Sequence, residues 1–185
     1  AAPGHPRLAV PARAGDRPNI LFCFADDQSW PHAGACGDKV VKTPVFDRVA
    51  REGVLFNYAY CASPSCTPSR GAVLTGQQIW RLGEGAQLFG TLPVKHPVYT
   101  NMLAENGYLV GWMAKGWAPG NVTAGGHEHN PAGKMKVKSF KQFLDAVGPG
   151  QPWCFWFGSR DPHRGYKKGS GAASGMDPNA VEVPP

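Results

Sequence analysis

Short runs of apolar residues recur along the chain and predict the strands of a sheet. Residues 19–25 and 153–157 are continuous apolar runs, the pattern of strands that are buried on both faces. Residues 54–60 alternate like a third strand, and residues 108–114 form another strand-sized stretch. We therefore expect four strands, separated by polar segments.

Apolar residues between these strands recur with the spacing of a helix face. The predicted helices cover residues 44–52, 69–75, 99–106 and 140–147. Thr43 and Ser139 are suitable N-cap residues for two of them, and a glycine follows each of the four. This order of elements indicates an α/β domain with a mostly parallel sheet flanked by helices.

The composition predicts many loops between these elements. The 185 residues include 24 Gly and 18 Pro, about twice the usual share. Hydrophobic residues still make up 42% of the chain, which excludes a wholly disordered protein. Residues 1–18 lack an apolar period, and we expect them to form a flexible lead-in. No apolar stretch has the length of a membrane span.

The charge balance favours an anionic ligand. The chain has 19 Lys and Arg against 13 Asp and Glu, a net charge of +6. Nucleic-acid binders usually show a denser basic stripe with aromatic residues between the charges, so we expect no nucleic-acid partner. A pocket or rim for a small or polymeric anion agrees better with the distribution. The main basic cluster comprises Lys134, Lys136, Lys138, Lys141, Arg160, Arg164, Lys167 and Lys168.

The five cysteines are an odd number, so at least one thiol is unpaired or chemically modified. No Cys-x-x-Cys pair is present, which argues against a zinc ribbon or a thioredoxin-type site. Cys23 and Cys154 lie inside apolar runs and are expected in the core. Cys66 either pairs with Cys61 in a local disulfide or remains a free thiol near a helix start, where an anion is readily bound.

Polar residues follow several predicted strands, at the edge where parallel sheets bind ligands. Asp26 and Asp27 follow the first strand, Lys115 follows residues 108–114, and residues 161–164 follow the last strand. Two adjacent carboxylates supply oxygen ligands for Ca²⁺ or Mg²⁺, although both reach one ion only if the backbone turns there. A solvated turn or a helix cap is the alternative interpretation.

The segment from Cys66 to Gly76 reads Cys-Thr-Pro-Ser-Arg-Gly-Ala-Val-Leu-Thr-Gly. It resembles the type I sulfatase signature, Cys-x-Pro-Ser-Arg-x-x-x-Leu-Thr-Gly, without a departure. Residues 17–27 are similar to the family's first strand and metal-binding Asp pair, and residues 43–50 to its next helix. Residues 161–164 resemble a segment of the heparan N-sulfatases (sulfamidases). The resemblance implies an alkaline-phosphatase-like sulfatase fold, with residues 19–185 as the amino-terminal part of the catalytic α/β domain.

The same resemblance implies a specific chemistry for Cys66. A formylglycine-generating enzyme would oxidise this residue to formylglycine, an aldehyde that is hydrated at rest. One hydroxyl of the hydrate attacks sulfur, and the aldehyde reforms as sulfate leaves. Asp26, Asp27 and residue 66 would bind Ca²⁺, with Mg²⁺ also acceptable to the carboxylates.

The resemblance also implies catalytic roles for three further residues. Arg70 would hold the formylglycine hydrate, and Lys115 would bind a sulfate oxygen. His163 would contact the substrate oxygen and protonate the leaving group. From the residues alone, the favoured interpretations of Lys115 and His163 are an ordinary surface lysine and a loop histidine next to proline.

The sequence departs from the family pattern at three points. Trp117 stands where the family usually has a histidine, and His127 or His129 is a candidate substitute. Arg160 stands where sulfamidases tend to have another histidine. The family's second pair of metal ligands, Asp-Asn, has no match. We therefore expect an amino-terminal portion of a longer enzyme, with little activity by itself.

The resemblance implies a hydrolase that removes a sulfate ester or an N-sulfate from a sulfated sugar, such as a glycosaminoglycan. The first alternative is a phosphate or phosphonate ester hydrolase of the same superfamily. The second is a non-catalytic sulfatase-like fragment that binds carbohydrate. We expect an exported protein, in a periplasmic, extracellular or lysosome-like location.

Overall fold

The computed structural model describes residues 17–163, 165 and 167–181, which form two compact units. The sheet unit comprises residues 17–27 and 60–162. The smaller unit comprises residues 28–59 and the described residues from His163 onward. Of the predicted lead-in, all but Arg17 and Pro18 lies outside the described residues. No described helix is both long and apolar enough to cross a membrane.

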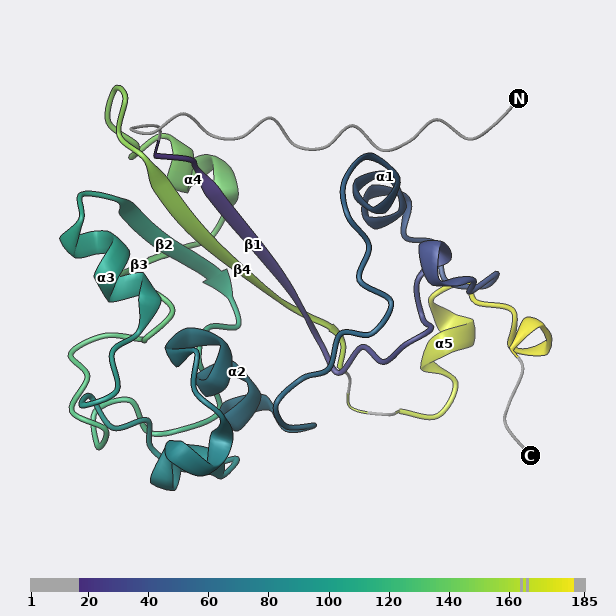
Figure 1. Cartoon of the computed structure of the whole chain (residues 1–185). Helices are drawn as coiled ribbons and strands as arrows, with labels where there is room; N and C mark the ends of the chain where they lie inside the picture. Colours follow the sequence, from purple (N-terminus) through teal and green to yellow (C-terminus); the bar gives the residue numbers. More distant parts are fainter. Residues whose placement is uncertain (1–16, 164, 166, 182–185) are drawn as a thin grey trace. The chain divides into compact units, whose positions relative to one another are not determined.

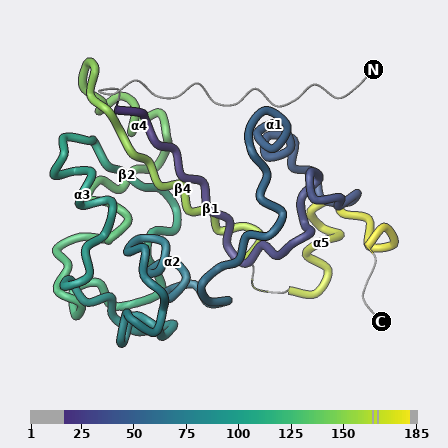
Figure 2. Tube along the Cα trace, in the orientation of Figure 1, coloured from purple at the N-terminus to yellow at the C-terminus, as the bar shows by residue number. Residues whose placement is uncertain are grey.

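The sheet unit is built on four parallel strands, which confirms the predicted fold class (Figure 1). The strands are β1 (Ile20–Asp26), β2 (Leu109–Ala114), β3 (Met135–Val137) and β4 (Trp153–Pro162). Their order in the sheet is β1-β4-β2-β3, and each neighbouring pair is parallel. Figure 2 shows β1 and β4 side by side, although more than a hundred residues separate them in the chain. The three-residue strand β3 was not predicted.

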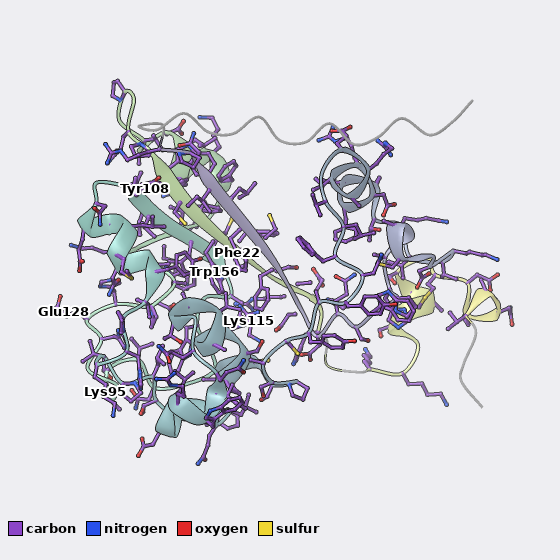
Figure 3. All side chains as sticks on the ribbon, viewed as in Figure 1. Phe22, Lys95, Tyr108, Lys115, Glu128 and Trp156 are labelled. Carbon is purple, nitrogen blue, oxygen red and sulfur yellow. The ribbon has the colours of Figure 1, made fainter. Side chains whose placement is uncertain are left out.

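Apolar side chains cover both faces of the sheet. One face carries Phe22, Trp112 and Trp156, which join a buried cluster with Leu74 of α2 (Cys66–Thr75). The rings of Phe22 and Trp156 lie 5.0 Å apart, centroid to centroid (Figure 3). The other face carries Phe155, against which Phe143 of α4 (Phe140–Leu144) packs with a centroid distance of 4.6 Å. Cys154 is buried as predicted.

The predicted helices are confirmed with small shifts in their ends. The remaining α-helices are α1 (Pro44–Glu52), α3 (Tyr99–Glu105) and α5 (Ser170–Ala173). Ser139 caps α4, because its hydroxyl accepts a hydrogen bond from the Gln142 amide. Thr43 precedes α1 as predicted, but its hydroxyl donates to the Asp47 carboxylate and caps no amide of the helix. Short 3₁₀ turns cover Gly34–Cys36, Ile79–Arg81, Gly83–Ala86 and Pro178–Ala180.

Two sequence predictions about strands are wrong. Residues 54–60 form turns and irregular backbone, since no described strand pairs with them, and their large side chains are exposed. The strand β1 is buried on one face only. Leu21 (53% exposed) and Cys23 are accessible, because β1 is the edge strand of this sheet and α4 packs against its neighbours.

Candidate functional site

The end of β1 turns so that two adjacent carboxylates face the same point. Asp26 is the last residue of the strand and is buried. Asp27 has a φ of 60°, the left-handed conformation that Asp tolerates better than most residues. Without this turn the two side chains would point to opposite faces of the strand. From the sequence, a backbone turn is required here for both carboxylates to reach one ion, and the structure has this turn.

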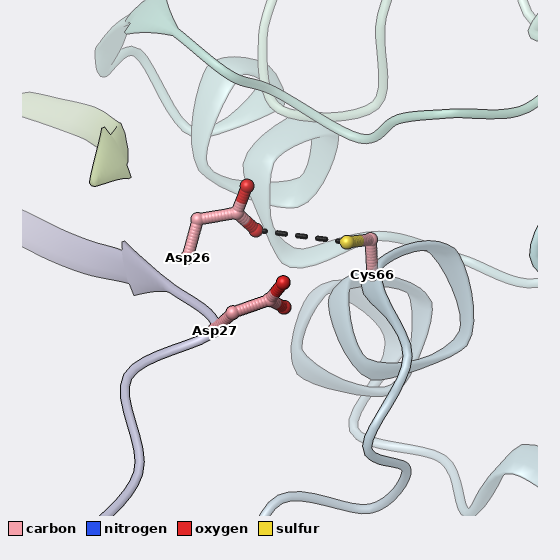
Figure 4. Close-up of side chains that lie close together, drawn as sticks. All are labelled: Asp26, Asp27 and Cys66. Atoms are coloured by element: carbon pink, nitrogen blue, oxygen red, sulfur yellow. Dashed lines mark hydrogen bonds between the residues drawn. The ribbon is translucent and has the colours of Figure 1, made fainter. Parts of the chain in front are cut away.

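Cys66 begins α2, directly opposite these carboxylates (Figure 4). Ligand atoms of Asp26, Asp27 and Cys66 all lie within 4.8 Å of one another. In the described part of the chain, this is the only group of three or more potential metal ligands that are so close together. Cys61 and Cys66 are both free thiols, so the local disulfide is not formed.

Arg70, one turn into α2, is buried with 1% of its surface exposed. One guanidinium nitrogen donates to Asp26 Oδ1 at 3.1 Å, and the other donates to the carbonyls of Lys115 (2.9 Å) and Gly116 (3.1 Å). The guanidinium also lies over the Phe24 ring, 4.7 Å from its centroid. Arg70 Nε is buried and has no protein partner among the described residues. One donor of this buried cation therefore has no protein acceptor among the described residues.

Lys115 follows β2 and brings a second positive charge to the same place (Figure 3). Its Nζ donates to Asp26 Oδ2 at 2.6 Å and to Cys66 Sγ at 3.1 Å. Its backbone is fixed by β4, since its amide donates to the Gly158 carbonyl and its carbonyl accepts from the Trp156 indole. The structure thus brings five of the six predicted site residues together from β1, α2 and the end of β2.

Charge compensation at Asp26 is strong. Burial alone raises the pKa of this carboxyl, but hydrogen bonds from Lys115 and Arg70, together with their charges, outweigh it. The pKa of Asp26 therefore lies below its usual value, and the group is ionised at neutral pH. Two carboxylates and two cations surround Cys66 before any ligand binds.

The comparisons with known proteins agree with this geometry. Residues 18–173 match the family model described as Sulfatase. The chain belongs to the sulfatase family.

Several curated sulfatases are similar to the chain. Human N-acetylgalactosamine-6-sulfatase is 33% identical over 155 residues, which cover 80% of this chain and 26% of that protein. The ulvan-active sulfatase of Formosa agariphila is 33% identical over 157 residues, which cover 82% of this chain and 31% of that protein. Human arylsulfatase D is 35% identical over 127 residues, which cover 62% of this chain and 21% of that protein. The chain spans about a fifth to a third of the length of these relatives.

Solved structures share the fold. The crystal structure of Ps i-CgsB in complex with k-i-k-neocarrahexaose superposes with a TM-score of 0.66 at 21% identity. The match covers 90% of this chain and 50% of that one. The structure of BT4656 in complex with its substrate, D-glucosamine-2-N,6-O-disulfate, gives a TM-score of 0.63 at 22% identity and covers 82% and 36%.

The donor set of this sulfatase-family chain would fit a hard divalent cation if residue 66 carried oxygen in place of sulfur. The carboxylates of Asp26 and Asp27 are the ligands that Ca²⁺ and Mg²⁺ prefer, whereas the thiol of Cys66 is a soft ligand that suits other metals. Replacing the thiol by a hydrated aldehyde would make the three donors uniform. Arg70 Nε, buried beside Asp26 and without a protein partner among the described residues, is an unused donor in the same site. Because Ca²⁺ takes six to eight oxygens, these three residues account for only part of a shell.

One departure from the sulfatase pattern, at Trp117, has a structural explanation. Trp117 is a core residue, 1% exposed, so this position packs the interior. Asn130 holds Trp117 in place by accepting from its amide and donating to its carbonyl, both at 2.9 Å. Nothing in the sequence marks Asn130 as part of the site's support. The proposed substitute His127 is itself buried, 6% exposed.

The sixth predicted site residue, His163, belongs to the smaller unit. It follows directly after β4, and Arg160 is exposed near the end of the same strand. The catalytic role of His163 remains a prediction.

Proposed function

We propose that this sulfatase-family chain serves the hydrolysis of a sulfate ester or N-sulfate on a sulfated sugar, with residue 66 as formylglycine. The observation that carries the proposal is the convergence of Asp26, Asp27 and Cys66 within 4.8 Å, beside the cations Arg70 and Lys115. Two curated relatives act by name on N-acetylgalactosamine-6-sulfate and on ulvan, which supports a sugar substrate.

The side chains around residue 66 suit a sulfate group. The Lys115 ammonium, 3.1 Å from Cys66 Sγ, and the Arg70 guanidinium present positive charge to oxygens that gain negative charge in the transition state. The start of α2 adds backbone amides without intrahelical partners, which favour anions. These groups are held rigidly by buried contacts, so they need little reorganisation during reaction.

Asp26, Asp27 and residue 66 would hold the metal. A bound Ca²⁺ or Mg²⁺ would supply positive charge that lowers the pKa of a hydroxyl on residue 66 and attracts sulfate oxygens. A formylglycine-generating enzyme is the partner required for maturation, and an exported location stays a prediction from the family resemblance. The N-sulfate assignment rests on residues 161–164 and stays a prediction.

Peptide mass measurement across residue 66 tests the proposal most directly. After co-expression with a formylglycine-generating enzyme, we expect the aldehyde at this position and an unmodified Cys61 as the internal control. An intact thiol at residue 66 would favour the alternative of a non-catalytic, carbohydrate-binding sulfatase relative.

Sulfate release is then assayed on the gene product at its natural length, with matched sulfate and phosphate esters of one sugar. We expect sulfate release that is lost in Cys66→Ala, because no aldehyde forms there. Preferential phosphate release would favour the phosphohydrolase alternative instead.

Metal binding is tested independently by titrating Ca²⁺ into the mature protein and following the thermal midpoint. We expect a rise of the midpoint with Ca²⁺, since a ligand that binds only the folded state stabilises it. The Asp27→Asn variant should show a smaller rise. An equal rise in the variant would contradict the assignment of Asp27 as a ligand.

A further inference from the structure

A row of three lysines lies on the sheet unit and is not used by the candidate site. Lys134, Lys136 and Lys138 alternate with Met135 and Val137 through and around the edge strand β3. The lysines are exposed, whereas Met135 is half-buried and Val137 is 5% exposed. Lys136 lies in β3, Lys134 and Lys138 lie in the bends that flank it, and the three exposed lysines alternate with the less exposed Met135 and Val137.

The row is held on a rigid support. β3 pairs with β2 in the register Trp112↔Lys136, and the Lys136 ammonium lies over the Trp112 ring, 4.8 Å from its centroid. Val137 belongs to the buried cluster around Phe143 and Phe155, which fixes the opposite face of the strand. Lys136 is therefore presented from the sheet itself, and Lys134 and Lys138 stand two residues before and after it.

These charges are also uncompensated by nearby acids. Among the described residues, no carboxylate lies within 4 Å of the ammonium groups of the three lysines. By contrast, the neighbouring Lys141 is paired with Asp145 at 2.8 Å. Three exposed cations within five residues, without a carboxylate within 4 Å among the described residues, are complementary to a polyanion.

We propose that Lys134, Lys136 and Lys138 form a binding row for a sulfated polysaccharide, outside the candidate site. This rests on the proposed function for the sulfated nature of the sugar. A nucleic acid fits less well, because Met135 and Val137 between the lysines are not aromatic, and the Trp112 ring under Lys136 is buried and cannot stack on a base. Edge-strand lysines also prevent strand pairing between molecules, and that role alone requires no polysaccharide binding.

Heparin binding by the full chain tests the proposal in a salt series. The triple variant Lys134→Gln, Lys136→Gln, Lys138→Gln should bind heparin on the order of 10- to 100-fold more weakly at low salt. Its affinity should also fall less steeply with salt, because fewer counterions are released on binding. The matched control, Lys39→Gln, Lys42→Gln, Lys95→Gln, removes the same charge at other exposed positions. Its affinity for heparin should fall by less than about threefold.

The outcomes separate the explanations. Equal losses in the two triple variants, or no loss in either, would overturn the proposal. Duplex DNA bound as tightly as heparin, and through the same lysines, would overturn the choice of partner. If the triple variant does not fold, the pair Lys134→Gln and Lys138→Gln, both outside β3, gives the same comparison.

The test does not depend on the proposed activity. Sulfate release from a small sulfated sugar, assayed in parallel, should be unchanged in the lysine variants. Loss of heparin binding without any sulfate release would overturn the proposed function alone, whereas normal sulfate release with unchanged heparin binding would overturn the binding row alone.

Discussion

Asp26 is the residue on which most interactions of the candidate site depend. Its two carboxylate oxygens accept from Lys115 at 2.6 Å and from Arg70 at 3.1 Å, in surroundings where its own side chain is 5% exposed. Removing one partner of such a buried group leaves the remaining charges without compensation. Asp27 offers a carboxylate to the same point but is exposed.

We therefore expect Asp26→Asn to lower the free energy of unfolding by about 3–5 kcal/mol. The matched control is Asp27→Asn, which removes an equal charge and keeps a residue type that tolerates a positive φ. It should cost less than about 1 kcal/mol. Urea denaturation at neutral pH measures both, and similar losses in the two variants would contradict the central place given to Asp26.

At the scale of elements, the close approach of β4 to the residue after β2 sets the position of Lys115. The Gly158 carbonyl in β4 accepts a hydrogen bond from the Lys115 amide. A Cβ built on Gly158 would lie 1.8 Å from the Lys115 carbonyl oxygen. Only glycine permits this backbone contact. The contact fixes the backbone from which the Lys115 side chain reaches Asp26 and Cys66.

The Gly158→Ala variant should consequently separate β4 from Lys115 and destabilise the sheet unit by about 1–3 kcal/mol or more. A suitable control is Gly148→Ala, where a Cβ would meet only the side chain of Gln151, at 3.3 Å. Thermal melting of the two variants measures the difference. A Gly158→Ala protein as stable as the control would show that this contact relaxes without cost.

At the scale of the whole molecule, a buried histidine links stability to pH. Burial of His127 lowers its pKa below 6.5, and the nearby His129 acts in the same direction, against a backbone hydrogen bond with Leu92 that raises it. The unfolded chain therefore binds a proton more readily than the folded chain below about pH 6.5. The stability contributed by neutral His127 is present above that pH and is lost as the pH falls toward the folded-state pKa.

His127→Gln should remove this dependence. The difference in unfolding free energy between the parent and the variant should favour the parent most above pH 7 and shrink as the pH falls below 6.5. Urea midpoints of the parent and the variant at several pH values provide the measurement. A difference that stays constant across this range would show that His127 does not titrate differently in the two states.

Much of this architecture followed from the sequence because the determining signals are local. The apolar runs of β1 and β4, the Ser139 cap and the glycines after the helices depend on near neighbours, and the predicted elements agree with them. The prediction of a strand over residues 54–60 was wrong because a strand also depends on contacts with distant residues. A strand needs a partner, and an alternating pattern cannot supply one.

The sequence by itself determined the α/β class, the candidate ligands Asp26 and Asp27, and the signature around Cys66, since composition, periodicity and short motifs carry that information. Only the tertiary structure decided that β1 is an edge strand with Cys23 exposed, that Asp27 turns its carboxylate toward Cys66, and that Lys115 and Arg70 share Asp26. These features are contacts between segments that lie tens of residues apart, and they follow from sheet order and packing, which no local pattern encodes.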